Sequence, residues 1–188
     1  MPLANTEGEL SIRPFYPQMT QIGVDLLVLV EDWIVKFEGV QKTVLANNYS
    51  ATVEGNPVFF AQDDYFALVA GFEYPLVGVF DSVFDVNVLL EYQFDDRDEL
   101  ATTTAQNDLM AGTRIVFNDM DGTEILVGVV QDLDHSNVRS GFIEASSRLS
   151  DHWKWYIDAW YFSSDEPLEP SYLVRRDDYI QFSLEYYF

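Results

Sequence analysis

Cysteine is absent from this chain of 188 residues, so disulfides, thiolate metal sites and cysteine nucleophiles are excluded. Positive charge is scarce as well, because 10 lysines and arginines stand against 32 aspartates and glutamates, giving a formal net charge of −22. Phosphate binding needs a basic surface, so the composition argues against nucleic acid as a partner and against adsorption to an anionic membrane. Insertion into a membrane stays compatible with this charge if the acids lie in loops or in a wet interior.

Long apolar runs are missing too. The longest, "LLVLV" at 26–30 and "YFALVAGF" at 65–72, fall short of the roughly 18 residues that a membrane-spanning helix needs. The opening "MPLANTEGELSIRPF" has no basic segment followed by an apolar run, so no signal peptide is expected. An exported form is therefore expected to be mature or truncated.

Hydrophobic residues nevertheless make up 48% of the chain and aromatic residues 15%, and many alternate with polar ones. In the closing stretch "RRDDYIQFSLEYYF", Ile180, Phe182, Leu184, Tyr186 and Phe188 fall on one face of a strand. Similar alternation predicts strands at 22–30, 33–37, 65–74, 85–94, 108–117 and 153–162, and less regularly at about 123–132 and 138–149.

The lengths of these segments and of their links predict a membrane barrel. About ten residues per segment exceeds the roughly 5 to 6 of soluble strands and matches the roughly 9 to 11 of a tilted strand that crosses a bilayer. Short links at 31–32, 118–122 and 150–152 alternate with longer ones at 42–63, 95–107 and 163–177, and links of medium length stand at 75–84 and 133–137. Periplasmic turns and external loops alternate in this way in outer-membrane barrels. We therefore predict an all-β fold, an antiparallel transmembrane β-barrel of meander topology with about nine to ten strands in this chain.

Aromatic residues gather at the ends of the predicted strands, where a bilayer places an interfacial girdle. The predicted membrane-facing girdle consists of Trp33, Phe72, Tyr74, Tyr92, Phe94, Phe117, Trp153, Trp155, Tyr161, Tyr186 and Phe188. The alternative is a β-sandwich with these residues in its core. A sandwich explains the alternation but neither the sorted links nor the terminal Phe188.

The alternating last strand that ends in Phe188 resembles the carboxy-terminal signal read by the barrel-assembly machinery of Gram-negative outer membranes. More broadly, "GFEYPLVGVFDSVFDVNVLLEYQFDDRDELATT" (71–103) and "NDLMAGTRIVFNDMDGTEILVGVVQDLD" (107–134) resemble a group of uncharacterised porin-like outer-membrane proteins. The resemblance runs from about Tyr16 onward. It implies an outer-membrane location among lipid and lipopolysaccharide. Because those relatives have more strands upstream, it also implies that this chain corresponds to the carboxy-terminal part of a larger barrel.

Residues 1–16 are predicted to be an amino-terminal segment, a loop or weak strand, and residues 17–188 to carry the barrel strands. A single-chain bacterial barrel has an even strand number, which nine segments do not satisfy. The segment "GELSIRP" (8–14) can add a tenth strand through Leu10 and Ile12, although Pro14 cannot donate to a ladder. Two possibilities stay open: self-closure with ten strands, or closure with strands supplied from upstream or by a homo-oligomer.

The face opposite the lipid carries charges of both signs, which line aqueous pores and discriminate between permeants. The predicted pore-lining residues are Asp25, Lys36, Glu73, Glu91, Arg114, Arg148, Lys154, Asp158 and Glu185. The predicted function is passive passage of small solutes, with no enzyme activity and no cofactor. In a closed ten-strand barrel the same residues would instead pair as a polar plug, because so narrow an interior fills with side chains.

Two other functions are compatible with the sequence. A non-conducting barrel can serve as an anchor, adhesin or receptor through long acidic loops such as "DDRDE" (95–99) and "SSDEPLEP" (163–170). A surface hydrolase can use Asp132, Asp134 and His135, which resemble the aspartate and histidine that activate water in omptin-type outer-membrane proteases. The acidic loops can also hold calcium or magnesium against lipopolysaccharide phosphates, but no spaced ligand loop is present and no metal site is predicted.

Overall fold

A computed structural model of the chain describes residues 2–4, 10–12, 18–44, 49–53, 56–60, 64–97, 106–167 and 170–188. The chain divides into two compact units, Met1–Gly23 with Val40–Phe66, and Val24–Gly39 with Ala67–Phe188. No helix of the described residues is long and apolar enough to cross a membrane.

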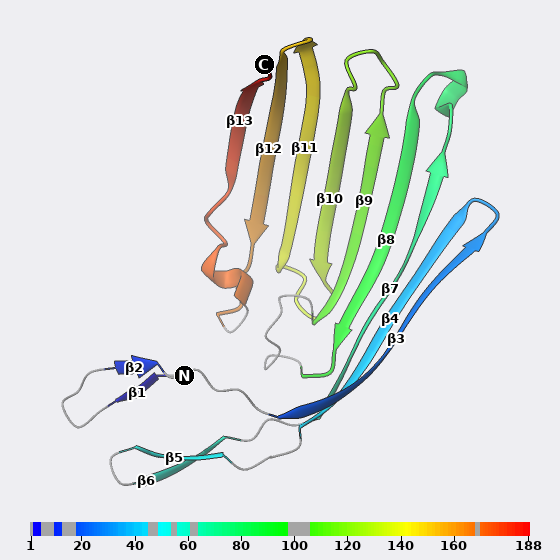
Figure 1. Cartoon of the computed structure of the whole chain (residues 1–188). Helices are drawn as coiled ribbons and strands as arrows, with labels where there is room; N and C mark the ends of the chain where they lie inside the picture. The colour runs from blue at the N-terminus through cyan, green and yellow to red at the C-terminus, as the bar shows by residue number, and fades with distance from the viewer. Residues whose placement is uncertain are drawn as a thin grey trace. The chain divides into compact units, whose positions relative to one another are not determined.

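The main element is a nine-stranded antiparallel sheet. Its strands, in spatial order, are β13 (Tyr179–Tyr186), β12 (Trp153–Ser163), β11 (Arg139–Ser150), β10 (Glu124–Asp132), β9 (Asn107–Val116), β8 (Asp85–Asp95), β7 (Tyr65–Leu76), β4 (Trp33–Val44) and β3 (Met19–Val30). Each strand pairs with the next strand of the sheet along the chain, so the topology is a meander (Figure 1). The predicted all-β meander of nine long strands is confirmed.

The links of the meander fall alternately at the two ends of the sheet, and the two tightest turns, after β3 and after β11, share one end. The turns between β3 and β4, between β9 and β10 and between β11 and β12 lie at one end, together with the longer link from β7 to β8 (Figure 1). The link from β10 to β11 lies at the other end, where β8 and β12 also end and β9 and β13 begin (Figure 1). The short 3-10 segments η1 (Val79–Asp81) and η3 (Pro170–Leu173) lie in links. In the turn after β9, Asp119 accepts a hydrogen bond from the Thr123 backbone N–H at 2.8 Å, and this bond lowers the pKa of the Asp119 carboxyl.

The sheet differs from the prediction in being open, with β3 and β13 as its two edges. The predicted tenth strand does not join it, because β2 (Leu10–Ile12) pairs with β1 (Pro2–Ala4) in a separate two-stranded sheet. A second hairpin, β5 (Tyr49–Val53) with β6 (Asn56–Phe60), lies within the link that the sequence predicts as a loop at 42–63. Pairing over only five residues per strand gives little alternation to detect.

The register of the strands separates two faces across the sheet. In β13, Ile180, Phe182 and Leu184 pair with Ala159, Ile157 and Trp155 of β12, so these side chains share one face. The same face continues through Ile143 on β11, Val127 on β10, Thr113 on β9, Val88 on β8 and Tyr74 on β7. We call it the apolar face, and the opposite side the polar face.

The apolar face is not buried in a core. Among the described side chains, the only buried hydrophobic residues are Val44, Tyr65 and Val138. On the edge strand β13, the exposed fractions of Ile180 and Phe182 are 80% and 64%. Within the second unit, Figure 1 shows a single layer of strands. The arrangement therefore lacks the second packed layer that a soluble sandwich uses to cover such a face.

Candidate functional site

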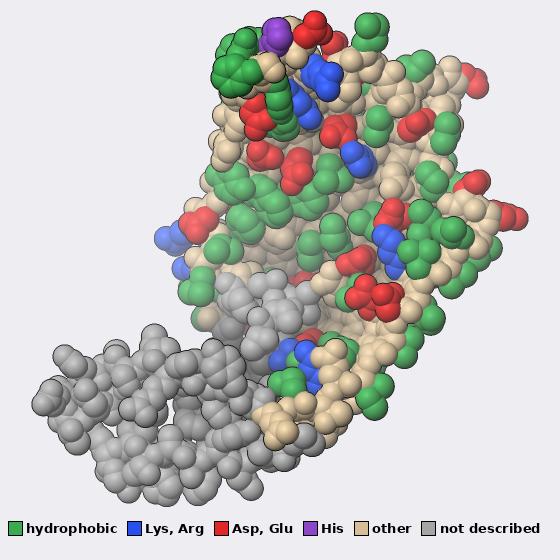
Figure 2. All heavy atoms as spheres, in the orientation of Figure 1, with side chains coloured by type: hydrophobic (Ala, Val, Ile, Leu, Met, Phe, Trp, Pro, Cys, Tyr) green, Lys and Arg blue, Asp and Glu red, His purple; other side chains and the backbone are tan. Residues whose placement is uncertain are grey.

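The polar face of the sheet is the candidate functional site (Figure 2). The register places on it most of the predicted pore-lining residues, namely Glu73, Glu91, Arg114, Arg148, Lys154, Asp158 and Glu185. Lys36 joins them through an ion pair with Glu73. Asp25 lies on the edge strand β3 and is exposed. That this face lines a pore stays a prediction.

Ion pairs link neighbouring strands across this face. Glu73 on β7 accepts hydrogen bonds from Lys36 Nζ on β4 and from Asn87 Nδ2 on β8, the latter at 3.1 Å. Arg114 on β9 donates to Glu124 on β10, with Nε 3.1 Å from Oε2. Because Glu124 is partly exposed and Arg114 exposed, such pairs contribute little to stability, but they fix where the charges lie.

A second group of polar contacts lies at the end of the sheet with the short turns. The Tyr187 hydroxyl donates to Glu185 Oε2 at 2.6 Å and lies 3.1 Å from the Tyr156 hydroxyl. The bond to Glu185 raises the pKa of Tyr187, because ionisation would remove the proton that Tyr187 donates and would place a phenolate beside a carboxylate. Lys154 lies 4.7 Å from the centre of the Tyr156 ring, so this end of the face carries a cation held over an aromatic ring.

Two carboxylates in the middle of the face form no ion pair with any described residue. Glu144 on β11 and Asp158 on β12 are register partners, so their side chains leave the sheet side by side. Neither forms a hydrogen bond or an ion pair with any described residue. Like charges directly opposite each other destabilise a strand pair, so this pair favours a nearby solvent cation. Sequence reasoning identified Asp158 but missed Glu144, because the pairing appears only once the register is known.

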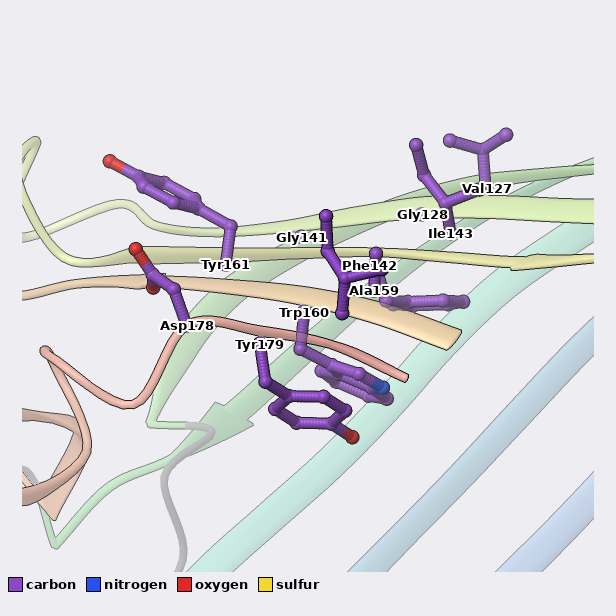
Figure 3. A pocket seen from close by; sticks show the side chains of 11 residues that line it. Val127, Gly128, Gly141, Phe142, Ile143, Ala159, Trp160, Tyr161, Asp178 and Tyr179 are labelled. Atoms are coloured by element: carbon purple, nitrogen blue, oxygen red, sulfur yellow. The ribbon is translucent and has the colours of Figure 1, made fainter. Parts of the chain in front are cut away.

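An aromatic row also crosses the polar face, and the sequence did not predict it. Tyr179, Trp160, Phe142 and Gly128 are successive register partners on β13, β12, β11 and β10. The rings of Phe142 and Trp160 stack with centroids 5.0 Å apart and planes at 25°. Figure 3 shows the Phe142, Trp160 and Tyr179 rings on the opposite side of the strands from Tyr161 and Val127. The polar face therefore has a hydrophobic band beside its charges.

The absence of a side chain at Gly128 leaves the space that the Phe142 ring occupies. A Cβ atom at residue 128 would come within 2.5 Å of two ring carbons of Phe142. We expect Gly128→Ala to cost about 1–3 kcal/mol of unfolding free energy, since the ring must leave its stacking position on Trp160. In the double variant Gly128→Ala with Phe142→Ala, the steric part of that cost should disappear, giving a coupling energy of about 1 kcal/mol or more.

Urea unfolding in lipid vesicles, followed by tryptophan fluorescence, measures this coupling for the four members of the cycle. Strictly additive free energies would contradict the assigned contact. Phe142→Ala alone serves as the reference for the lost stacking.

Buried carboxylates gather at the end of the sheet with the long links. Asp108 and Asp132 are register partners, with exposed fractions of 5% and 7%. Asp132 Oδ1 accepts the backbone N–H groups of Asp134 and His135 at 2.7 and 2.8 Å, and the His135 ring lies 3.4 Å from Oδ2. Asp132 thus caps the link from β10 to β11.

Two further acids at this end of the sheet are also engaged, Asp134 of the hydrolase hypothesis and Asp95. Asp95 binds the Arg97 side chain, with Nε 2.9 Å away, and Asp134 accepts from Asn107 Nδ2 at 2.9 Å. Within the described ranges, no group of three or more His, Asp or Glu residues is arranged to hold a metal ion. A hydrolytic role for Asp132, Asp134 and His135 stays a prediction.

The predicted girdle residues lie largely on the apolar face. The register places Phe72, Tyr74, Tyr92, Phe94, Trp153, Trp155, Tyr161 and Tyr186 there. Trp33 packs edge-on against Phe72 and at a tilt against Tyr74, with ring centroids 5.0 and 4.6 Å away. Phe117 and Phe188, just outside the strands, contact Phe84 and Tyr186. Membrane contact of these rings stays a prediction.

Comparisons of the chain with protein-family models, with curated proteins and with solved structures found no match. The functional argument therefore depends on the two faces of the sheet, the distribution of charge and the state of the edges.

Proposed function

We propose that this protein is a porin-like outer-membrane β-barrel that passes small solutes passively through a lumen lined by the polar face. The observation that carries the proposal is the continuous apolar face, which spans the sheet and is covered by no second layer of strands in the described second unit. Each large apolar side chain left in water forgoes about 1.5–3 kcal/mol, so a face of this extent favours a hydrocarbon surrounding.

The aromatic residues support the same proposal. Trp33, Phe72 and Tyr74 form one cluster at the end with the short turns, and Trp153, Tyr186 and Phe188 form another. Tyrosine and tryptophan favour the two water interfaces of a bilayer. Two clusters at the same end of the sheet fit one such interface.

The charge distribution supports an aqueous opposite face. Lateral ion pairs form there between Lys36 and Glu73 and between Arg114 and Glu124, while no described residue neutralises Glu144 or Asp158. Buried charge without a partner is costly, so the middle of this face favours contact with water and cations. Under this proposal the lumen prefers cations.

Closure needs strands beyond the nine of the sheet. Nine consecutive antiparallel strands leave β3 and β13 running in the same direction, so joining them directly would make a parallel pair. An all-antiparallel barrel therefore requires an odd number of additional strands between these edges. A barrel larger than ten strands has room for water beside its side chains, which favours a pore over a plug. The strand β13 then serves as the contact for the barrel-assembly machinery.

Planar-bilayer recording tests the proposal. The full chain, extracted in detergent and added to a bilayer, should give stepwise increases in conductance. Protein that shifts its gel migration on boiling but conducts nothing would reject the pore and keep the barrel. The lateral ion pairs would then act as a plug, in a protein that serves as an anchor, adhesin or receptor through its loops. Protein that is monomeric and monodisperse without detergent would contradict a membrane barrel.

A further inference from the structure

The aromatic row lies on the polar face, where passage of small hydrophilic solutes gives it no role. Phe162 extends the row on β12, because it leaves the sheet on the same side as Trp160 two residues earlier. Figure 2 shows hydrophobic side chains gathered over β11 to β13 on this face, next to acidic ones. The Phe142, Trp160 and Phe162 side chains are partly exposed, and 46% of Tyr179 is accessible. An apolar patch on a face that meets water marks a ligand-binding surface.

The rings of the row cover one another only in part. The centroid of Trp160 lies 5.0 Å from that of Phe142 and 6.0 Å from that of Phe162. Both distances exceed the roughly 3.5–4.0 Å at which carbon atoms touch, so the stacked rings are offset and part of each face stays uncovered. Figure 3 shows the Phe142, Trp160 and Tyr179 rings beside one another on this side of the strands. The face of an aromatic ring is electron-rich and attracts cations.

Unpaired negative charge lies beside the row. Asp158 and Glu144 are two residues from ring-bearing residues of β12 and β11, hence about 7 Å along the strands on the same face. Neither carboxylate forms a hydrogen bond or an ion pair with any described residue. Arg114, two strands beyond Glu144 in the same register row, is paired with Glu124. The surface therefore combines an apolar aromatic part with an anionic part.

We propose that this surface binds organic cations, with the apolar part of the ligand on the aromatic row and its ammonium group between Glu144 and Asp158. The inference deepens the proposed function and rests on it, because it names the permeants of the lumen as amines with an apolar substituent. Charge complementarity selects this class. An inorganic cation would leave the rings without a partner, and a neutral apolar solute would leave the two carboxylates without one.

Block of the potassium current in planar bilayers tests the proposal, with hexylammonium, methylammonium, hexanol and maltose as probes. Hexylammonium alone carries both the charge and the apolar chain, so it should halve the current at a concentration at least about tenfold below those of methylammonium and hexanol. Trp160→Ala should raise this concentration at least about tenfold, while Trp160→Phe, which keeps a ring, should raise it less. The double variant Glu144→Gln with Asp158→Asn should reduce the potency of hexylammonium to that of hexanol.

Two variants serve as matched controls. Trp155→Ala makes the same change on β12 but on the apolar face, and Asp121→Asn with Asp151→Asn removes two exposed carboxylates from turns. Hexylammonium should block both as it blocks the unmodified chain. Equal potency of hexylammonium, methylammonium and hexanol, unchanged by Trp160→Ala, would overturn the proposal. So would block by maltose in place of hexylammonium, which would identify a sugar as the ligand.

Equilibrium dialysis of hexylammonium against the refolded chain in a non-ionic detergent separates the two proposals, with empty micelles as the blank. Protein that conducts but neither binds hexylammonium nor is blocked by it refutes only the ammonium site. Protein that conducts nothing but binds hexylammonium, with the same dependence on Trp160, refutes the pore and retains the site. Protein that neither conducts nor binds refutes both.

Discussion

Gly71→Ala should abolish assembly of the sheet between β7 and β8. A Cβ atom at residue 71 would lie 2.6 Å from the backbone oxygen of Leu90 and 3.1 Å from Cα of Glu91. Both are atoms of the paired strand, so relief requires the two backbones to separate and the ladder between them to break. We expect a loss of about 3 kcal/mol or more, at the upper end of overpacking costs. The measurement is the fraction of protein that shifts its gel migration on boiling after refolding into detergent.

Gly112→Ala is the matched control for this prediction. Gly112 is another glycine on the polar face, but its nearest contact to an added Cβ is 3.4 Å, an ordinary van der Waals distance. It should refold nearly as well as the unmodified chain. Equal refolding of the Gly71→Ala and Gly112→Ala variants would contradict the close approach assigned to β7 and β8.

The double variant Glu144→Lys with Asp158→Lys should reverse the preference of the pore for cations. Each substitution changes the charge by two units at a position where no described residue neutralises it. Coulomb's law in water gives about 0.6 kcal/mol per pair of unit charges at about 7 Å, so the combined change is about 2 kcal/mol before screening. We expect the cation-to-anion permeability ratio to fall at least about tenfold. The reversal potential across a potassium chloride gradient measures it.

Asp151→Lys is the control for a change of net charge outside the proposed permeation path. Asp151 lies exposed in the turn between β11 and β12, outside the strands. A charge there is screened by salt over about 8–10 Å and should change the ratio little. A double variant that conducts with unchanged selectivity would place Glu144 and Asp158 outside the permeation path, and the polar face would then not be the lumen.

The sequence by itself determined the strands and their two faces. A side-chain period of two is a local property, so the segment ending "FSLEYYF" and its counterparts indicate which residues leave a strand on the same side. The nine-strand meander followed from this pattern and from turn residues such as those around Asp119.

Only the tertiary structure decided which residues become lateral neighbours, because the pairing register depends on contacts between segments far apart in the sequence. It brought Glu144 beside Asp158 and laid the Phe142 ring over Gly128, neither of which a single strand can reveal. It also left β3 and β13 as open edges and placed Leu10–Ile12 in a separate hairpin. Edge pairing is decided by the hydrogen-bonding partners within reach, and alternation within one strand carries no information about them.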